Sequence, residues 1–161
     1  MTTLYLTQRA FKQIDQAVKK QPLVETGGIL MGLQLEKGDY IVSYASEPGP
    51  RAIQTRNTIM FDDPYLRELV RKIRRRTAGR LQYVGDWHSH TVKRLSPSKG
   101  DRETILSKHT NNLYASSSPL MLIAGLDKRH QLLARAFILA DSFREVDQIQ
   151  LYQKQVNRPL F

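Results

Sequence analysis

Four residues with metal-binding or proton-transferring side chains follow one another at fixed spacings in the middle of the chain. His88 and His90 are two residues apart, Ser98 comes eight residues later, and Asp101 three residues after that. In a β-strand, side chains at positions i and i+2 point to the same face, about 6–7 Å apart, so two imidazoles can converge on one cation. An aspartate entering from the next element would add a third ligand and leave a fourth tetrahedral position for water. The spacing therefore predicts a catalytic zinc site.

The second half of this pattern has two compatible interpretations. Ser98 and Asp101 form an ordinary helix start, in which a serine caps the helix and an acid lies in its first turn. Beside a metal, the same hydroxyl can donate a hydrogen bond to the oxyanion that develops on an attacked carbonyl. Hydrolysis also needs a base that takes a proton from water and passes it to the leaving amine. We expect this base to be a carboxylate near the metal but not bound to it.

The composition is that of a globular protein with a strongly basic balance. Of the 161 residues, 25 are Lys or Arg and 15 are Asp or Glu, which gives a net charge of +10 and favours an acidic partner or nucleic acid. The absence of cysteine excludes disulfides, thiolate metal sites and a cysteine nucleophile. The first residues do not have the pattern of a signal peptide, and no apolar run approaches about 18 residues. We therefore expect a cytoplasmic protein.

Hydrophobic patterns in the first third of the chain predict strands and one helix. Residues 2–6 alternate like a strand, and Thr7 can cap a helix with its apolar positions on one face. Residues 25–32 predict a glycine-containing strand. A turn at Gly38 would lead into a second strand over 40–45, which makes a hairpin.

The middle of the chain contains the elements that must position the histidines. Residues 47–56, with two prolines and a glycine, are predicted as a loop, and a short strand over 57–61 follows. Asp62, Asp63 and Pro64 predict the start of a helix that ends near Thr77. Residues 81–91 predict the strand that carries both histidines.

The last part of the chain completes a mixed architecture. A helix is predicted over 99–112, a hairpin with strands over 119–125 and 131–139, and a last strand over 146–152. Helices that are interspersed among hairpins indicate an α+β fold, a mixed sheet flanked by helices, and not a regular parallel α/β fold.

The segment from His88 to Asp101 resembles the signature of the JAMM (JAB/MPN+) metallopeptidases. In that family a distant Glu is followed by His-x-His, seven residues, Ser, two residues and Asp, and every marked position matches here. Glu25, within Glu-Thr-Gly-Gly-Ile-Leu-Met-Gly, lies in a segment that looks like the family's Glu strand. The resemblance implies that His88, His90 and Asp101 bind one zinc ion, that Glu25 is the general base and that Ser98 stabilises the oxyanion.

The resemblance covers about residues 2–140 and has consequences for fold and activity. It implies a curved mixed β-sheet flanked by helices, the cytidine-deaminase-like JAB/MPN fold, in a single domain over residues 1–161. It also implies zinc-dependent hydrolysis of a peptide or isopeptide bond after the C-terminal tail of ubiquitin or a ubiquitin-like protein. As a small, single-domain form without extra modules, the chain resembles the prokaryotic branch of the family. Members of that branch act as deconjugating peptidases in antiphage operons of the CBASS and Bil-like type. Thr91-Val92-Lys93 differs from the Pro-Ser-Gly of the DNA-repair-associated branch, which argues against that branch.

The expected partners are the tail of a ubiquitin-like protein and its conjugate, and no membrane is expected. A peptidase for a sulfur carrier or another small β-grasp protein is the alternative within the enzyme class. A non-catalytic MPN interaction module, or a nucleic-acid-binding protein that uses the basic helix over 64–80, is the alternative outside it. Intact Glu25 and Asp101 argue against the non-catalytic module. The arginines of the helix could dock an acidic partner, but a solvated helix face is the simpler interpretation, and the lack of interleaved aromatic residues disfavours single-stranded nucleic acid.

Other residues near the motif have simpler expected roles. Trp87 should face away from the metal and pack in the core, whereas Asp86 shares the face of His88 and is either a supporting acid or a structural one. His109 and His130 are expected at the surface. We also expect the loop over 48–58 and the segment over 91–95 to border a groove that takes an extended tail by strand addition.

Overall fold

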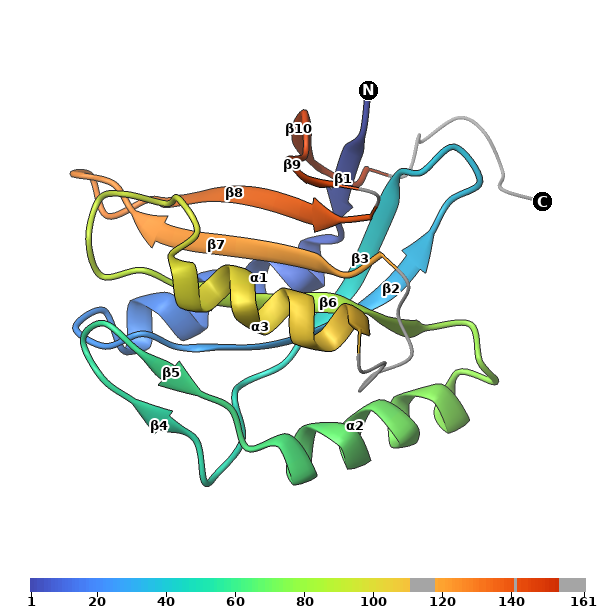
Figure 1. Cartoon of the computed structure of the whole chain (residues 1–161), viewed down its shortest axis with the longest axis horizontal. Coiled ribbons are helices and arrows are strands. Elements are labelled where there is room, and N and C mark those ends of the chain that lie inside the picture. Colours follow the sequence, from blue (N-terminus) through green and yellow to red (C-terminus); the bar gives the residue numbers. More distant parts are fainter. Residues whose placement is uncertain (111–117, 141, 154–161) are drawn as a thin grey trace.

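The computed structural model describes residues 1–110, 118–140 and 142–153. Within these residues, an eight-stranded mixed sheet with the order β10-β1-β3-β2-β6-β7-β8-β9 forms the centre of the molecule, and β4 and β5 form a separate small hairpin (Figure 1). The strands are β1 (Thr3–Leu6), β2 (Gly27–Gln34), β3 (Tyr40–Ala45), β4 (Ile53–Gln54), β5 (Ile59–Met60), β6 (Gln82–Ser89), β7 (Leu120–Leu126), β8 (Leu132–Leu139), β9 (Phe143–Glu145) and β10 (Gln148–Leu151).

Three helices pack on this sheet within the described residues: α1 (Gln8–Lys20), α2 (Asp63–Arg76) and α3 (Lys99–Thr110). Helix α1 lies behind the sheet in Figure 1, while α3 crosses in front of it and α2 runs along its lower side. Each helix has its own apolar cluster. Ile14 of α1 belongs to the largest one, Leu66 of α2 packs with Ile29 and Tyr83, and Ile105 of α3 packs with neighbours that include Ile123.

Capping side chains begin both long helices where the sequence predicts them. The Thr7 hydroxyl accepts a hydrogen bond from the Ala10 amide, and the Asp62 carboxylate accepts one from Tyr65. Both side chains satisfy an amide that has no partner within its helix. The predicted α+β class and mixed sheet are confirmed.

The strand that carries the histidines lies in the middle of the sheet. β6 pairs antiparallel with β2 and parallel with β7, and α3 belongs to the crossover between β6 and β7. A parallel pair needs such a crossover, which therefore brings the start of α3 to the end of β6. The fold thus places the two halves of the motif side by side.

Several predicted boundaries differ from the structure. β2 begins at Gly27, so Glu25 precedes the strand, and β6 ends at Ser89, so His90 lies one residue beyond it. The predicted loop over 47–56 contains β4, the predicted last strand over 146–152 corresponds to β10, and β9 before it was not predicted. β4 and β9 have two and three residues and are too short to show a period, which is why they were missed. The predicted helix end at Asn112 lies outside the described residues.

Candidate metal and catalytic site

Strands on both sides fix the backbone of the two histidines. His88 pairs with Gly27 of β2 and with Ile123 of β7, and the His90 amide donates to the Ala124 carbonyl at 2.9 Å. The close approach of β2 requires a glycine, because a Cβ at Gly27 would overlap the carbonyl oxygen of Trp87. This half of the site is part of the core sheet, and His88 is only 6% exposed.

Ser98 and Asp101 form a reciprocal helix cap at the start of α3. The Asp101 amide donates to the Ser98 hydroxyl oxygen at 3.0 Å, and the Ser98 amide donates to the Asp101 carboxylate at 2.8 Å. This is the arrangement of a capping box, with aspartate in the usual place of glutamate. Because the hydroxyl accepts through its oxygen, its hydrogen stays free to donate. The structural interpretation of this pair is therefore correct and compatible with the functional one.

Two imidazole nitrogens and both oxygens of one carboxylate converge where β6 meets α3. The Nε2 atoms of His88 and His90 are 3.1 Å apart, and each lies 3.3 Å from a carboxylate oxygen of Asp101. Among the described residues, these three side chains are the group whose ligand atoms could hold a metal ion. Ligands at about 2.0–2.2 Å from a tetrahedral zinc ion lie about 3.3–3.6 Å from one another. The observed separations are close to that spacing.

The hydrogen bonds around the cluster also suit a cation. Nδ1 of His90 lies 2.9 Å from the Arg94 carbonyl, which can only accept, so in the neutral ring Nε2 presents its lone pair to the cluster. A carbonyl partner of this kind fixes the tautomer and orientation of metal-binding imidazoles. The Asp101 carboxylate raises the pKa of His90 against the opposing effect of burial. Burial alone would raise the pKa of Asp101, but hydrogen bonds to His88 and His90 hold that pKa well below its usual range.

Glu25 is 8% exposed, and its carboxyl lies close enough to His88, His90 and Asp101 to interact electrostatically with them. The Glu25 amide donates to the Thr55 carbonyl at 2.7 Å, and the Glu25 carbonyl accepts from the Gln54 side chain at 3.2 Å. β4 and the residue after it therefore hold the backbone of Glu25. The next residue, Thr26, exchanges hydrogen bonds with Ser89. Burial raises the pKa of the Glu25 carboxyl, while His88 and His90 lower it and Asp101 raises it. The carboxyl is thus within electrostatic reach of all three clustered side chains.

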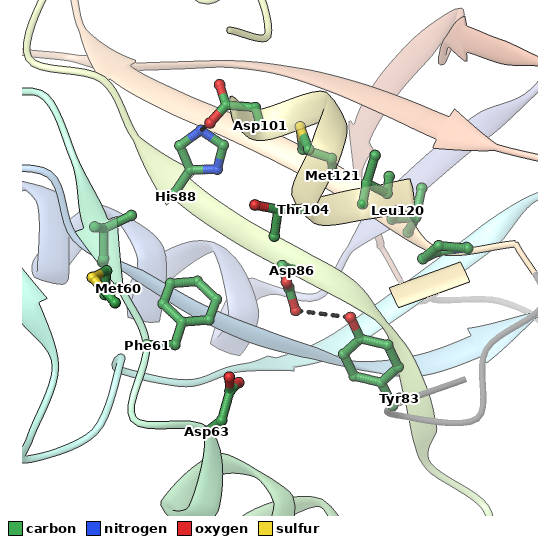
Figure 2. Close-up of a pocket in the computed structure, with 13 residues that line it drawn as sticks. Met60, Phe61, Asp63, Tyr83, Asp86, His88, Asp101, Thr104, Leu120 and Met121 are labelled. Carbon is green, nitrogen blue, oxygen red and sulfur yellow. Dashed lines mark hydrogen bonds and ion pairs between the residues drawn. The ribbon is translucent and has the colours of Figure 1, made fainter. Parts of the chain in front are cut away.

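A cavity of about 260 Å³ opens beside His88 and Asp101. Figure 2 shows residues of β5, β6, α3 and β7 around it, with Phe61 and Met121 among its apolar walls. Asp86 lines this cavity, as its shared strand face with His88 predicts, and accepts a hydrogen bond from the Tyr83 hydroxyl at 2.8 Å.

A smaller cavity of about 80 Å³ lies on the His90 side and is lined in part by Ser89, His90 and residues 91–93. The Thr91 hydroxyl donates to the Arg56 carbonyl at 2.6 Å. This hydrogen bond ties residues 91–93 to the tip of the β4–β5 hairpin. Of the expected groove borders, residues 91–93 line the smaller cavity, whereas residues 48–50 and Gln54 line a separate one. Residues 59–61, which line the larger cavity, lie just beyond the expected loop.

The remaining sequence-based expectations can be compared directly. Trp87 is fully buried and donates from Nε1 to the Ser46 carbonyl at 2.9 Å, so its packing role is confirmed. His130 is exposed, as expected, and the side chain of His109 lies outside the described residues. The sequence predicted a strand where β5 lies but missed β4 and its pairing with β5, which positions this hairpin at the site. Within the part of the chain that is described, no helix combines the length and apolarity needed to cross a membrane.

Comparison with known proteins gives consistent matches. Residues 7–137 match the family model described as prokaryotic homologs of the JAB domain. A CD-NTase/cGAS isopeptidase of Enterobacter hormaechei subsp. hoffmannii is 30% identical over 127 residues, which cover 78% of this chain and 68% of that protein. A CD-NTase/cGAS isopeptidase of Vibrio cholerae serotype O1 is 31% identical over 102 residues, which cover 63% of this chain and 62% of that protein. The chain thus spans about two thirds of the length of these relatives.

The architecture also matches a solved structure. The solution structure of a protein from Desulfitobacterium hafniense superimposes with a TM-score of 0.64 and 20% sequence identity, covering 98% of this chain and 97% of that one. At this identity the likeness supports the fold alone.

Proposed function

We propose a function from the premise that this chain belongs to the family of prokaryotic homologs of the JAB domain, whose model matches most of it. The chain is a JAMM-type peptidase that hydrolyses the bond after the C-terminal tail of a ubiquitin-like protein, either in a conjugate or in a precursor. The relatives named as CD-NTase/cGAS isopeptidases support an isopeptide substrate and make CD-NTase conjugates the first ones to test. Residues 1–161 act as a single domain in this proposal.

One observation carries the proposal: the ligand atoms of His88, His90 and Asp101 converge. A second, buried acid, Glu25, is not part of this group and stays available as a base. Nitrogen and carboxylate oxygen are ligands that zinc prefers, and three protein ligands leave one position for water. His88, His90 and Asp101 would hold one zinc ion per chain. When bound, the ion supplies a Lewis acid and lowers the pKa of water.

Glu25 acts as the general base and then as the general acid. Its carboxylate takes a proton from the attacking water and returns it to the leaving amine. The burial that raises its pKa makes it a better proton acceptor than an exposed carboxylate. The hydrogen bonds of its backbone to Thr55 and Gln54 hold it in place while it does so.

Ser98 stabilises the negative charge that develops on the attacked carbonyl. Its hydroxyl oxygen is engaged with the Asp101 amide, so the O–H is oriented by the same cap that positions the proposed ligand. A donor that is fixed before reaction needs no reorganisation in the transition state.

The substrate tail lies in an extended form in a groove that is bordered by the β4–β5 hairpin and residues 91–95. The bond between Thr91 and Arg56 joins these two segments on one side of the cluster, and Met60 of β5 lines the cavity on the other. An extended tail can add main-chain hydrogen bonds to a short strand such as β5.

Metal analysis combined with cleavage of a tail-fusion substrate tests this function. The purified protein should contain about one zinc ion per chain, and a chelator should abolish cleavage, which added zinc restores. Full activity of the metal-free protein would overturn the proposal.

A further inference from the structure

Helix α2 and the turn after it form a concentrated positive surface. Seven cations against one acid, Glu68, give residues 67–80 a net charge of +6, more than half of the +10 of the chain. The cations are Arg67, Arg71, Lys72, Arg74, Arg75, Arg76 and Arg80.

Most of these cations project away from the sheet. The buried side of α2 consists of Leu66 and Val70, with the partly buried Leu69 and Ile73 beside them. The side chains of Arg71 and Arg75 are 65% and 75% exposed even though both lie near Glu68. Arg67 and Lys72 are exposed as well. The outer face of the helix is thus cationic over most of its length.

The fold itself does not account for this face. Cations four residues apart on a helix repel each other, and Arg67/Arg71, Arg71/Arg75 and Lys72/Arg76 are three such pairs. The helix dipole favours cations in the last turn only. Glu68 offsets this repulsion only in part, because one acid faces Arg71 and Arg75. A simple need for solubility would be met by charges of mixed sign.

The position of α2 links this face to the proposed site. Asp63, at the N-terminus of α2, lines the same cavity as His88 and Asp101, and the helix extends away from there along the lower side of the sheet (Figure 1). Its 14 residues span about 21 Å at 1.5 Å per residue. A folded domain of about 75 residues has a radius of gyration of about 11 Å and is therefore wide enough to reach from the site to this face.

We propose that the exposed cationic face of α2 docks an acidic surface of the folded protein whose C-terminal tail enters the site. The inference rests on the proposed peptidase function and adds a recognition surface to it. A protein is favoured over single-stranded nucleic acid because residues 66–80 contain no aromatic side chain on which bases could stack. Charge complementarity of this kind mainly raises the rate of association and the selectivity for the partner.

Two substrates with the same cleavable tail test the inference. One carries the tail on a small folded domain with an acidic surface, the other on a matched domain with a neutral surface. The wild-type protein should cleave the acidic fusion with a kcat/KM about tenfold higher at low salt, mainly through KM, and the preference should shrink as salt is added. Cleavage of both fusions tests the proposed function, whereas their ratio tests the docking surface.

The triple variant Arg71→Gln/Lys72→Gln/Arg75→Gln should bring this ratio close to one. A matched variant, Lys12→Gln/Lys37→Gln/Lys128→Gln, loses the same charge from exposed positions on three other segments and should keep most of the preference. The α2 variant removes repulsion between cations but also the contacts of Arg71 and Arg75 with Glu68, so its melting temperature should stay close to that of the wild type. An equal effect of the two triple variants would overturn the inference. Binding of a DNA duplex through the same three residues at physiological salt would also overturn the inference, because the face would then be a nucleic-acid-binding surface.

Discussion

The two halves of the candidate site are held in different ways. His88 lies within β6, with β2 on one side and β7 on the other, and its backbone is part of the central sheet. Ser98 and Asp101 lie at the exposed start of α3, where the main constraint is the pair of hydrogen bonds between them. The strand half of the site, His88 and His90, is positioned by the central sheet. The helix half, Ser98 and Asp101, is positioned by a local helix cap and by its contacts with the histidines.

This difference explains why a metal would matter for structure as well as for chemistry. The Asp101 carboxylate of α3 lies 3.3 Å from Nε2 of both His88 and His90. A cation converts that arrangement into three attractive contacts that join α3 to β6.

The largest expected effect comes from a matched pair of glycine substitutions. Gly27→Ala places a Cβ against the Trp87 carbonyl in the strand half, and should cost more than about 4 kcal/mol or prevent folding. Gly100→Ala in α3 meets nothing nearer than the Ser98 hydroxyl at 3.8 Å and should stabilise the protein by about 0.5–1 kcal/mol. Urea denaturation measures both values, and similar effects in the two variants would contradict the proposed difference in packing.

The next effect separates the proposed base from the proposed ligands. Glu25→Gln removes a proton acceptor while keeping its shape, so it should retain zinc and lose about 10²–10⁴ in kcat. Asp101→Asn should lose both activity and metal affinity, because a ligand is removed. Metal content and single-turnover cleavage of a tail fusion distinguish the two outcomes. Normal turnover by the Glu25 variant would show that another group is the base.

The helix half could be predicted from the sequence almost completely, because its information is local. The Ser98-x-x-Asp101 spacing specifies both the cap and the relation between donor and ligand. The two histidines were equally clear, since a period of two places both on one face. The approach of Glu25 was not visible in this way, because it depends on the pairing of β2 with β6, which joins residues about sixty positions apart. The resemblance to JAMM peptidases supplied that link.

The β4–β5 hairpin shows the limit of sequence patterns more clearly. Its strands have two residues each, and Pro48, Gly49 and Pro50 just before them are typical of an irregular loop. What makes the hairpin important is its contact with distant segments, through Thr55 to Glu25 and through Arg56 to Thr91. Contacts between segments far apart in the chain have no local signature, and only the fold reveals them.

A smaller effect tests whether Ser98 does more than begin the helix. Ser98→Ala removes both the cap and the O–H donor, and should cost about 1 kcal/mol of stability and about 10²–10³ in kcat. Ser98→Asp keeps a capping oxygen but cannot donate when ionised, so it should restore stability and not activity. Thermal unfolding and kcat are the two measurements. Recovery of activity together with stability in the Asp variant would leave Ser98 with a structural role alone.

The smallest expected effect is the most direct test of how the two halves are joined. Chelation of the metal should leave amide exchange nearly unchanged in β6, whose hydrogen bonds to β2 and β7 do not depend on a ligand. Residues 99–104 at the start of α3 are mostly exposed, and should exchange about tenfold faster once Asp101 is no longer tied to the histidines. Hydrogen-exchange mass spectrometry of the zinc-loaded and chelated protein measures both segments in one experiment. Equal acceleration in β6 and α3 would mean that the metal stabilises the whole fold, and that the strand half is not rigid by itself.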